Sequence, residues 1–228
     1  MRLLEKLPHE NARTYAFRVL QHNIVTLELP PGTSISENEI AALMNVSRTP
    51  VREALIELNK MELVNILPQR GSYVAKIDYE LIEESRFIRL SLETSVLKLL
   101  CQEGISDEYR ELLHDNLKMQ KLHLKDDATH LGAWELDAEF HKLLFGAAGK
   151  YRAYHMIQNQ MVHFDRLRLL TLNTISVKNS KTINDHENIL YALEKQDGEL
   201  AELIMTQHLT RHRLEQAELR NQYPDYFL

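Results

Sequence analysis

The chain has 228 residues, of which 44% are hydrophobic and 26% charged, which is enough material for one large or two ordinary domains with a buried core. Its single cysteine, Cys101, excludes an intrachain disulfide, and no apolar run approaches the roughly 20 residues that a membrane-spanning helix needs. No N-terminal segment has the form of a signal peptide, so we expect a cytoplasmic protein with no membrane partner.

The formal net charge of −6 is unevenly distributed along the chain. Residues 1–76 carry 9 Lys and Arg against 8 Asp and Glu, whereas residues 77–228 carry 18 against 25. The acidity therefore belongs to the second part and does not exclude nucleic-acid binding by the first. Because the first part is only weakly basic, DNA binding would depend on a local arginine patch and on a dimer, and would be sensitive to salt.

The N-terminal part begins with a predicted helix and the first half of a helix–turn–helix. Apolar residues recur at helical spacing over residues 15–27, and the Leu-Pro-Pro-Gly run at 29–32 ends that helix. Ser36 followed by Glu39 is a capping box, which predicts a second helix with one apolar face. Asn45 tolerates turn conformations and is expected to separate this helix from the next.

The second helix of this pair carries basic residues at its start. Ser47 is a good N-cap residue, and Pro50 would lie in the first turn, where a missing N–H costs little. Arg48, Thr49 and Arg52 are left on the exposed N-terminal side, the end from which a recognition helix contacts bases and phosphates. We therefore treat these three as candidate DNA-contacting residues. The expected buried stripe comprises Val51, Ala54, Leu55 and Leu58.

Residues 64–77 predict a β-hairpin with a basic tip. Two runs of β-prone residues flank the turn Pro68-Gln69-Arg70-Gly71. A hairpin placed after a helix–turn–helix is typical of the wing of a winged helix. Arg70 and Gly71 are therefore further candidate DNA-contacting residues.

These segments together resemble the winged helix–turn–helix of the GntR family of bacterial transcription regulators over about residues 10–76. The resemblance rests on Pro31-Gly32, SENEIA at 36–41, SRTPVREAL at 47–55, Leu63-Val64, and Gly71 with Val74. It implies that Arg48 and Arg52 contact DNA and that the wing tip at Gly71 approaches the minor groove. Asn38 stands where some family members carry another DNA-contacting arginine, so that contact is not expected here.

Residues 77–228 are expected to form an all-α domain, because no proline occurs between Pro68 and Pro224 and glycine is sparse. Caps such as Asp78 and Ser106, together with periodicity, predict six antiparallel helices over about residues 78–103, 106–125, 129–146, 150–172, 181–196 and 197–222, with a loop at 173–180. The predicted fold class is therefore mostly α, with a winged helix–turn–helix over residues 1–76 and a helical bundle over residues 77–228.

Four residues of the predicted bundle form a candidate metal site. Asp137 and His141 are four residues apart and share one helical face, while His186 and His208 lie on the fifth and sixth helices. Three histidines and one carboxylate inside a bundle suit a transition metal such as zinc, nickel or manganese. Taken alone, an Asp–His pair at this spacing is more often a helix-surface interaction.

The bundle region resembles the FCD domain, the ligand-binding domain of a GntR subfamily, over about residues 78–220. The resemblance rests on IRLSLE at 88–93, DAEFHKLL at 137–144, HENI at 186–189, Gly198 with Ala201, and His208 with Leu209. It implies a divalent metal, zinc by default, at the four candidate ligands and a small carboxylate effector beside the metal.

Three residues are candidates for binding that effector. Arg89 stands where the subfamily often places a ligand-binding arginine, although it could instead only pair with Glu93, four residues on. Lys150 replaces an asparagine that the subfamily often has, so a cationic contact could replace a polar one. His163 is a candidate for lining the same cavity. Weaker candidates on the fourth helix of the bundle are Arg166 and Arg168.

We expect a ligand-responsive, sequence-specific transcription regulator, a repressor, that binds a pseudo-palindromic operator in double-stranded DNA as a homodimer. One alternative is a metal-dependent hydrolase in which Glu139 or Glu187 is the base beside a metal-activated water. Another is a regulator whose metal is structural or is itself the sensed signal, with no organic effector. The aromatic C-terminal run NQYPDYFL either packs on the bundle or is disordered.

Overall fold

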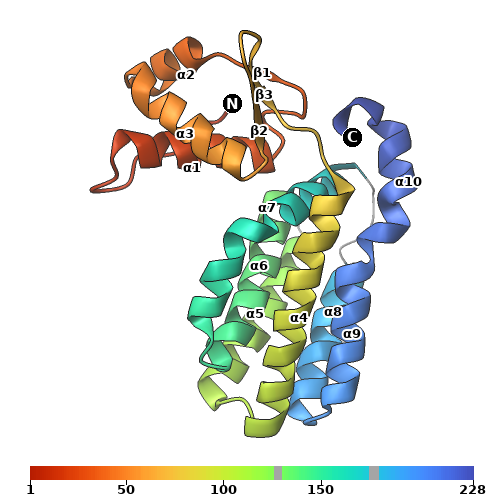
Figure 1. Ribbon diagram of the computed structural model, residues 1–228. Coiled ribbons are helices and arrows are strands. Elements are labelled where there is room, and N and C mark those ends of the chain that lie inside the picture. The colour runs from red at the N-terminus through yellow and green to blue at the C-terminus, as the bar shows by residue number, and fades with distance from the viewer. Residues whose placement is uncertain (126–129, 175–179) are drawn as a thin grey trace.

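The computed structural model describes residues 1–125, 130–174 and 180–228, which form a winged domain above a helical bundle (Figure 1). The winged domain contains α1 (Ala12–Val25), β1 (Ser34–Ile35), α2 (Glu37–Met44), α3 (Arg48–Lys60), β2 (Val64–Leu67) and β3 (Gly71–Val74). Its strands form an antiparallel sheet in the order β1-β3-β2. The predicted hairpin is present as β2 and β3, and the short β1 adds a strand that the sequence did not predict.

The ends of α1 differ from the predicted range of 15–27. Asn11 accepts a hydrogen bond from the backbone N–H of Thr14 at 2.9 Å, so the helix begins at Ala12. It ends at Val25, and Leu27 then adopts a positive φ of 63°, which a helix cannot contain. Periodicity located this helix correctly, whereas its ends depend on the cap and on the turn.

The helix–turn–helix of α2 and α3 follows the predicted caps closely. Ser36 accepts a hydrogen bond from the backbone N–H of Glu39 at 3.4 Å, and Asn45 ends α2 in the left-handed conformation with a φ of 53°. Ser47 stands at the N-cap of α3 as predicted, but its side chain makes no capping hydrogen bond. The start of α3 therefore leaves backbone N–H groups available at the end that carries Arg48.

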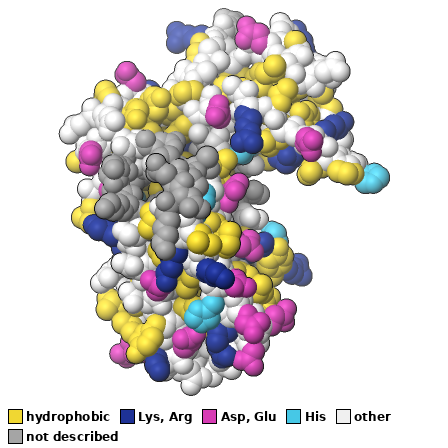
Figure 2. Space-filling model, turned by 180° about the vertical axis from the view of Figure 1, so that it is seen from behind, with side chains coloured by type: hydrophobic (Ala, Val, Ile, Leu, Met, Phe, Trp, Pro, Cys, Tyr) yellow, Lys and Arg dark blue, Asp and Glu magenta, His cyan; other side chains and the backbone are white. Residues whose placement is uncertain are grey.

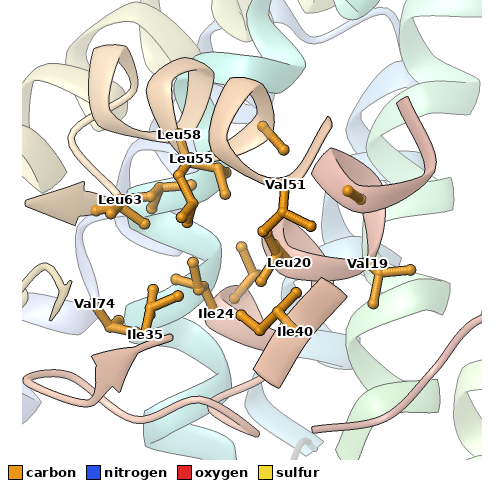
Figure 3. Packing of buried hydrophobic residues seen from close by; sticks show 14 of the residues in the cluster. Val19, Leu20, Ile24, Ile35, Ile40, Val51, Leu55, Leu58, Leu63 and Val74 are labelled. Atoms are coloured by element: carbon orange, nitrogen blue, oxygen red, sulfur yellow. The ribbon is translucent and has the colours of Figure 1, made fainter. Parts of the chain in front are cut away.

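One hydrophobic core joins α1, α2, α3 and the sheet (Figure 3). Val19 and Leu20 of α1 face the predicted buried stripe of α3, and all of these side chains are essentially inaccessible to solvent. The other labelled members of the core come from α1, α2, α3, β1, β3 and the residue before β2, namely Ile24, Ile35, Ile40, Val51, Leu55, Leu58, Leu63 and Val74. A displacement of α1 would therefore be transmitted to α3, because the two helices share one closely packed core.

The bundle contains five helices that match predicted ones closely and a sixth that is divided. These are α4 (Tyr79–Glu103), α5 (Asp107–Lys125), α6 (His130–Ala147), α7 (Tyr151–Thr174), α8 (Ser180–Glu194) and α9 (Gly198–Thr210). Asp78 caps α4 through the backbone N–H of Glu80, and Gly104 ends it with a φ of 82°. The predicted start at Thr129 and most of the predicted loop at 173–180 lie outside the described residues.

The prediction of one continuous helix over 197–222 was wrong, because α10 (His212–Gln222) follows α9 as a separate helix. Long-range contacts hold the junction. Arg211 donates to Asp185 Oδ2 of α8 at 2.6 Å, whereas Arg213 Nε donates to Glu83 Oε1 of α4 at 2.8 Å. No proline or glycine marks this break, so local sequence patterns could not reveal it.

The C-terminal tail packs on the linker between the two domains. After α10 it forms a short 3-10 helix (Pro224–Tyr226), and the N–H of Ile77 donates to the carbonyl of Tyr226 at 2.7 Å. The N–H of Leu228 donates back to the carbonyl of Ile77 at 3.1 Å. Phe227 stacks on Tyr79 with ring centroids 5.4 Å apart. The C-terminal run NQYPDYFL is thus packed against the rest of the molecule and is not disordered.

The winged domain and the bundle also contact each other directly. Val162 and Leu169 of α7 belong to the same hydrophobic core as α1. Arg166 of α7, fully buried, donates through Nη2 to the carbonyl of Ala75 in the linker at 2.5 Å. His163 Nε2 lies 2.9 Å from the carbonyl oxygen of Met61 at the end of α3. No helix in the described part of the chain is long and apolar enough to cross a membrane.

Candidate metal centre and DNA-contacting surface

The four candidate metal ligands converge in the interior of the bundle. Asp137 and His141 come from α6, His186 from α8 and His208 from α9, and all four are buried. One potential ligand atom from each residue lies within 4.8 Å of the others. Three helices that are separate in sequence therefore bring one carboxylate and three imidazoles to a single point, as the sequence predicted.

The distances at this point show how the ligand atoms face one another. His186 Nε2 lies 3.2 Å from Asp137 Oδ1, and His141 Nε2 lies 3.3 Å from His208 Nε2. His186 Nε2 is nevertheless buried without a hydrogen bond within the described residues. A buried polar nitrogen without a partner costs free energy, and a divalent cation is a partner that accepts nitrogen and carboxylate donors together. The donor set therefore fits a transition metal.

Each histidine is oriented by a second residue that the sequence analysis missed. His141 Nδ1 lies 2.5 Å from Glu93 Oε2, His186 Nδ1 lies 3.0 Å from Gln120 Oε1, and His208 Nδ1 lies 3.2 Å from Asp185 Oδ2. All three partners present acceptor oxygens, so each Nδ1 carries the proton and each Nε2 keeps its lone pair for the centre. Such partners fix the tautomer and the ring orientation of metal-binding histidines. The three oriented histidines are His141, His186 and His208.

Burial sets the protonation of this centre. Desolvation lowers the pKa of His141 to about 4 and that of His208 to about 3, so both rings are neutral at neutral pH. Burial alone would raise the pKa of Asp137, but the charge of Arg168 and contacts with His186 outweigh it and hold that pKa well below its usual value. Neutral imidazoles and an ionised carboxylate are the forms in which these side chains bind metal ions.

Asp137 also forms a bidentate ion pair with Arg168 of α7, in which Nη1 contacts Oδ2 and Nη2 contacts Oδ1. This pairing was not predicted, although Arg168 was a weaker candidate for effector binding. Each carboxylate oxygen has two lone pairs, so an oxygen that accepts from arginine can still face a cation. Arg168 therefore compensates the buried negative charge whether or not a cation is bound.

A cavity of about 420 Å³ reaches the centre and is lined by Asp137, His141 and Arg89. Arg89 is buried, and its Nε donates to Glu93 Oε1 at 2.5 Å. The sequence left open whether this arginine pairs with Glu93 or binds an effector. The structure shows the ion pair and also places Arg89 at the cavity, so the two roles are compatible.

A second, smaller cavity of about 80 Å³ reaches His208 from between α7, α8, α9 and α10. Its basic lining residues are Arg168, Lys181 and Arg211. Arg211 is already paired with Asp185, and Arg168 is paired with Asp137. Lys181 is therefore the one basic lining residue of this cavity that has no ion pair within the described residues.

The other two candidate effector residues lie elsewhere. Lys150 is exposed immediately before α7 and lines neither cavity that reaches the centre. His163 lines a separate cavity with Met61 and Glu62, at the contact between α3 and the bundle. The structure therefore brings Arg89 to the metal centre but not Lys150 or His163.

The candidate catalytic bases of the hydrolase alternative are also remote from the centre. Glu139 pairs with Lys142 on the surface of α6, and Glu187 pairs with Lys121 of α5. Neither glutamate lines a described cavity that reaches the four ligands. A metal-activated water at this centre would have neither of these two proposed bases within reach.

The candidate DNA-contacting residues form an exposed group on the winged domain. Arg48, Thr49 and Arg52 lie exposed at the start of α3, and Arg70 and Gly71 form the exposed end of the turn between β2 and β3. Gly71 has a φ of 99°, a left-handed conformation that favours glycine at this wing tip. On the face seen in Figure 2, basic side chains are interspersed with acidic ones over both domains. Residues 1–76 carry 9 Lys and Arg against 8 Asp and Glu, so local arginines, rather than a broad basic surface, supply the positive charge.

Glu37 at the start of α2 pairs with both arginines of α3, which the sequence analysis missed. Arg48 Nη2 donates to Glu37 Oε2 at 3.1 Å, and Arg52 Nε donates to Glu37 Oε1 at 3.1 Å. The two arginine side chains remain more than half exposed, at 59% and 62%. They are thus held in position and remain accessible to phosphates.

Comparison with known proteins matches both halves of this architecture. Residues 13–74 match the model described as bacterial regulatory proteins, gntR family, and residues 84–211 match the FCD domain. The chain is also 34% identical over 220 residues to the HTH-type transcriptional repressor RspR of Escherichia coli strain K12, covering 96% of this chain and 95% of that protein.

The chain belongs to the GntR family and carries an FCD domain.

A more distant relative is the gluconate operon transcriptional repressor of Bacillus subtilis strain 168, which is 28% identical over 186 residues, 79% of this chain and 75% of that protein. Among solved structures, E. coli McbR/YncC has a TM-score of 0.73 at 19% identity over 94% of this chain and 99% of its own. A putative GntR regulator from Rhodococcus sp. RHA1 has a TM-score of 0.68 at 21% identity, over 92% and 98%. At sequence identities of 19% and 21%, the structural similarity shows that the fold is shared.

Family membership makes this GntR protein a DNA-binding transcriptional regulator rather than an enzyme. The winged domain is its DNA-binding part, and an FCD domain implies regulation by a small molecule. FCD domains often bind a metal, and the buried group of one aspartate and three histidines is placed to hold one. The hydrolase alternative is thereby set aside.

Proposed function

We propose that this GntR protein is a transcriptional repressor that binds a pseudo-palindromic operator as a homodimer and responds to a small carboxylate effector held beside a divalent metal, zinc by default. The proposal rests on one observation, which is that the candidate metal centre and a buried arginine line the same cavity. Asp137 and His141 of the candidate metal centre line the same cavity as the buried cation Arg89. A metal ion and a guanidinium that face one cavity are complementary to a carboxylate.

The metal, when bound, supplies positive charge and open coordination positions to an effector carboxylate. Asp137, His141, His186 and His208 would hold it, and the partners of their Nδ1 atoms would orient the histidines. Arg89 would bind the same carboxylate from the side opposite its pairing with Glu93. Repression is favoured because RspR and the gluconate operon regulator, both similar to this chain, are named repressors.

The DNA-contacting residues in this proposal are Arg48, Thr49 and Arg52 of α3 and Arg70 and Gly71 of the wing. The recognition helix would read the major groove through its N-terminal end, while the wing would follow the adjacent backbone. A dimer is required because one winged domain with so small a net charge offers few phosphate contacts. Two-fold symmetry of the protein would then be mirrored in the operator.

The decisive test is elemental analysis of the purified protein, with a His186→Ala/His208→Ala double variant as its comparison. We expect about one transition-metal ion per chain in the wild type and none in the variant. A duplex selected in vitro from random DNA then tests operator binding with and without metal. Absence of metal after reconstitution would reject the metal centre, and absence of sequence-specific binding would reject the regulator's proposed DNA contacts. A change in operator binding on metal removal alone would favour a metal-sensing regulator.

A further inference from the structure

The cavity that reaches the metal centre has walls from both domains. Its inner wall comes from α4, α6 and α7 of the bundle and includes Arg89, Asp137 and His141. Its other wall comes from α1 of the winged domain, with Gln21 and His22, and from the C-cap residue Thr26. Helix α1 packs against α7 (Figure 1). The lining residues therefore place the cavity at a direct contact between the domains.

The α1 wall offers polar groups that are not used elsewhere. Gln21 and His22 are both half-buried, and neither side chain makes a hydrogen bond within the described residues. Burial, together with the nearby charge of Arg2, lowers the pKa of His22, so the ring faces the cavity as a neutral donor and acceptor. Half-buried polar groups in a cavity wall are suited to a ligand that carries its own hydrogen-bonding groups.

Arg18, the arginine of the α1 wall, already uses its side chain in other contacts. Arg18 Nε donates to Glu10 Oε1 at 2.8 Å, and its Nη2 donates to Glu10 Oε2 at 2.8 Å and to the carbonyl of Glu5 at 2.7 Å. These contacts tie the N-terminal segment to α1. Arg18 thus gives both Nε and Nη2 to Glu10, whereas Arg89 of the inner wall gives Nε to Glu93. Within the described contacts, Arg89 is therefore the arginine of this cavity with terminal nitrogens left for a carboxylate, and the α1 wall contributes neutral polar groups.

We propose that α1 forms part of the effector site, so that the effector lies with its carboxylate at Arg89 and the metal centre while hydrogen-bonding groups at its far end contact Gln21 and His22. This inference rests on the proposed function and specifies how its effector acts. The chemical class is a small carboxylate with hydroxyl or amide groups several atoms from the carboxylate. A carboxylate without such groups would reach only the inner wall.

The position of α1 gives this contact a direct route to DNA. Val19 and Leu20, on the same helix as the two cavity residues, share a closely packed core with α3. An effector that binds one position of α1 more tightly than another would therefore bias the position of the recognition helix. No displacement of the linker between β3 and α4 is needed for this effect.

The smaller cavity provides a rival location that can be tested with the same measurements. It reaches His208 and carries Lys181 as its basic residue without an ion pair in the described part of the chain. An effector located there would contact only the bundle. Substitutions at Lys181 and at the two α1 residues therefore distinguish the two cavities.

Isothermal titration calorimetry of zinc-reconstituted full-length protein tests the inference with two probes, D-gluconate, which has hydroxyls along its length, and acetate, which has none. We expect Gln21→Ala/His22→Ala to weaken gluconate binding by about ten-fold, the loss of two neutral hydrogen bonds, with little change for acetate. Arg13→Ala is the matched control on the exposed face of α1, and Lys181→Ala tests the smaller cavity. Both should leave gluconate binding unchanged.

Several outcomes would overturn the inference. Equal gluconate affinity in the wild type and the α1 double variant would remove α1 from the site, as would an effect of Lys181→Ala alone. Failure of the zinc-loaded wild type to bind gluconate would reject polyhydroxy carboxylates as the effector. Zinc content and binding of the selected duplex are measured on every sample. A wild type that lacks metal or DNA binding fails the proposed function, whereas one that has both but ignores the α1 substitutions fails only this inference.

Discussion

Glu37 of α2 and Arg52 of α3 form a two-point contact, in which Nε and Nη2 of the guanidinium donate to the two carboxylate oxygens at 3.1 Å each. The hydrogen bond from Arg52 is the main cause of the lowered pKa of Glu37, so this carboxylate stays ionised. The same glutamate also accepts from Arg48. The two arginines that the family resemblance assigns to DNA are thus neutralised in part by Glu37.

We predict that Glu37→Gln raises affinity for DNA of any sequence more than affinity for the selected operator. Removing the carboxylate frees both arginines and removes a charge that repels phosphates, so sequence discrimination should fall several-fold. Fluorescence anisotropy with the selected duplex and a scrambled duplex, at two salt concentrations, measures this. Glu57→Gln, which removes an equal charge beside Arg13 and Lys60, is the control. Equal effects of the two substitutions would show that only net charge matters.

Arg52→Ala and Arg70→Ala should weaken DNA binding in different ways. If Arg52 reads a base, its loss costs about 1–3 kcal/mol and relaxes specificity at one operator position. If Arg70 contacts only the backbone, its loss weakens all sequences alike and lowers the slope of log affinity against log salt by about one. The measurement is affinity for a set of single-position operator variants over a salt series. Loss of specificity in Arg70→Ala, with none in Arg52→Ala, would reverse these assignments.

Glu93→Gln should weaken metal binding although Glu93 is not itself one of the four candidate ligands. Glu93 accepts hydrogen bonds from His141 Nδ1 and from Arg89. It therefore orients the His141 ring and balances the charge of Arg89. Loss of such an orienting carboxylate typically costs about 10–100-fold in metal affinity. Competition with a zinc chelator measures the affinity, and Glu139→Gln, a partly exposed residue of α6 paired with Lys142, is the control. Unchanged zinc affinity would make Glu93 a partner of Arg89 only.

Metal-free protein should lose stability as the pH falls from about 6.5 towards 4. Burial lowers the folded-state pKa of His141 to about 4 and of His208 to about 3, below the usual value of 6.5. The unfolded chain then binds protons that the folded chain cannot, so the free energy of unfolding decreases with falling pH in this window. At pH 5 each histidine would cost about 2 kcal/mol.

Urea unfolding of chelator-treated protein at pH 7 and pH 5 measures this effect. His141→Gln and His208→Gln should each reduce the pH dependence, whereas His155→Gln, an exposed histidine, should leave it unchanged. Zinc should restore stability at pH 7 because it binds the neutral rings, and less so at pH 5. A wild type whose stability is equal at the two pH values would contradict the buried, neutral state of the two rings.

The helices that the sequence predicted well are those whose ends are marked locally. Asp78 and Gly104 delimit α4, and Ser36 with Asn45 delimits α2. The division between α9 and α10 has no such mark, because the contact of Arg213 with Glu83 joins residues 130 apart in sequence. Local patterns report caps and turns, whereas tertiary contacts decide where an otherwise favourable helix stops.

The candidate site shows the same division. Asp137 and His141 could be predicted together because they lie one helical turn apart. His186 and His208 were candidates by their places on two later helices, and the family resemblance supported all four as one set. The orienting partners Gln120 and Asp185 could not be predicted, since they meet their histidines across helices and carry no motif. One signal was available for Glu93. It lies four residues after Arg89 on α4, and both residues are buried.

Deletion of residues 224–228 should loosen the linker between the domains. Ile77 exchanges backbone hydrogen bonds with Tyr226 and Leu228, and Arg220 lies over the rings of Tyr79 and Phe227 with its Cζ 4.9 and 5.5 Å from their centroids. Without these contacts the winged domains would sample more orientations, and operator affinity should fall because ordering them costs entropy. Hydrogen exchange of the peptide containing Ile77 should accelerate, while that of α3 should not. Leu214→Ala, at an exposed position of α10, is the control. Faster exchange with unchanged operator affinity would limit the tail to a stabilising role. A loosened linker would then have no effect on how the two winged domains bind DNA.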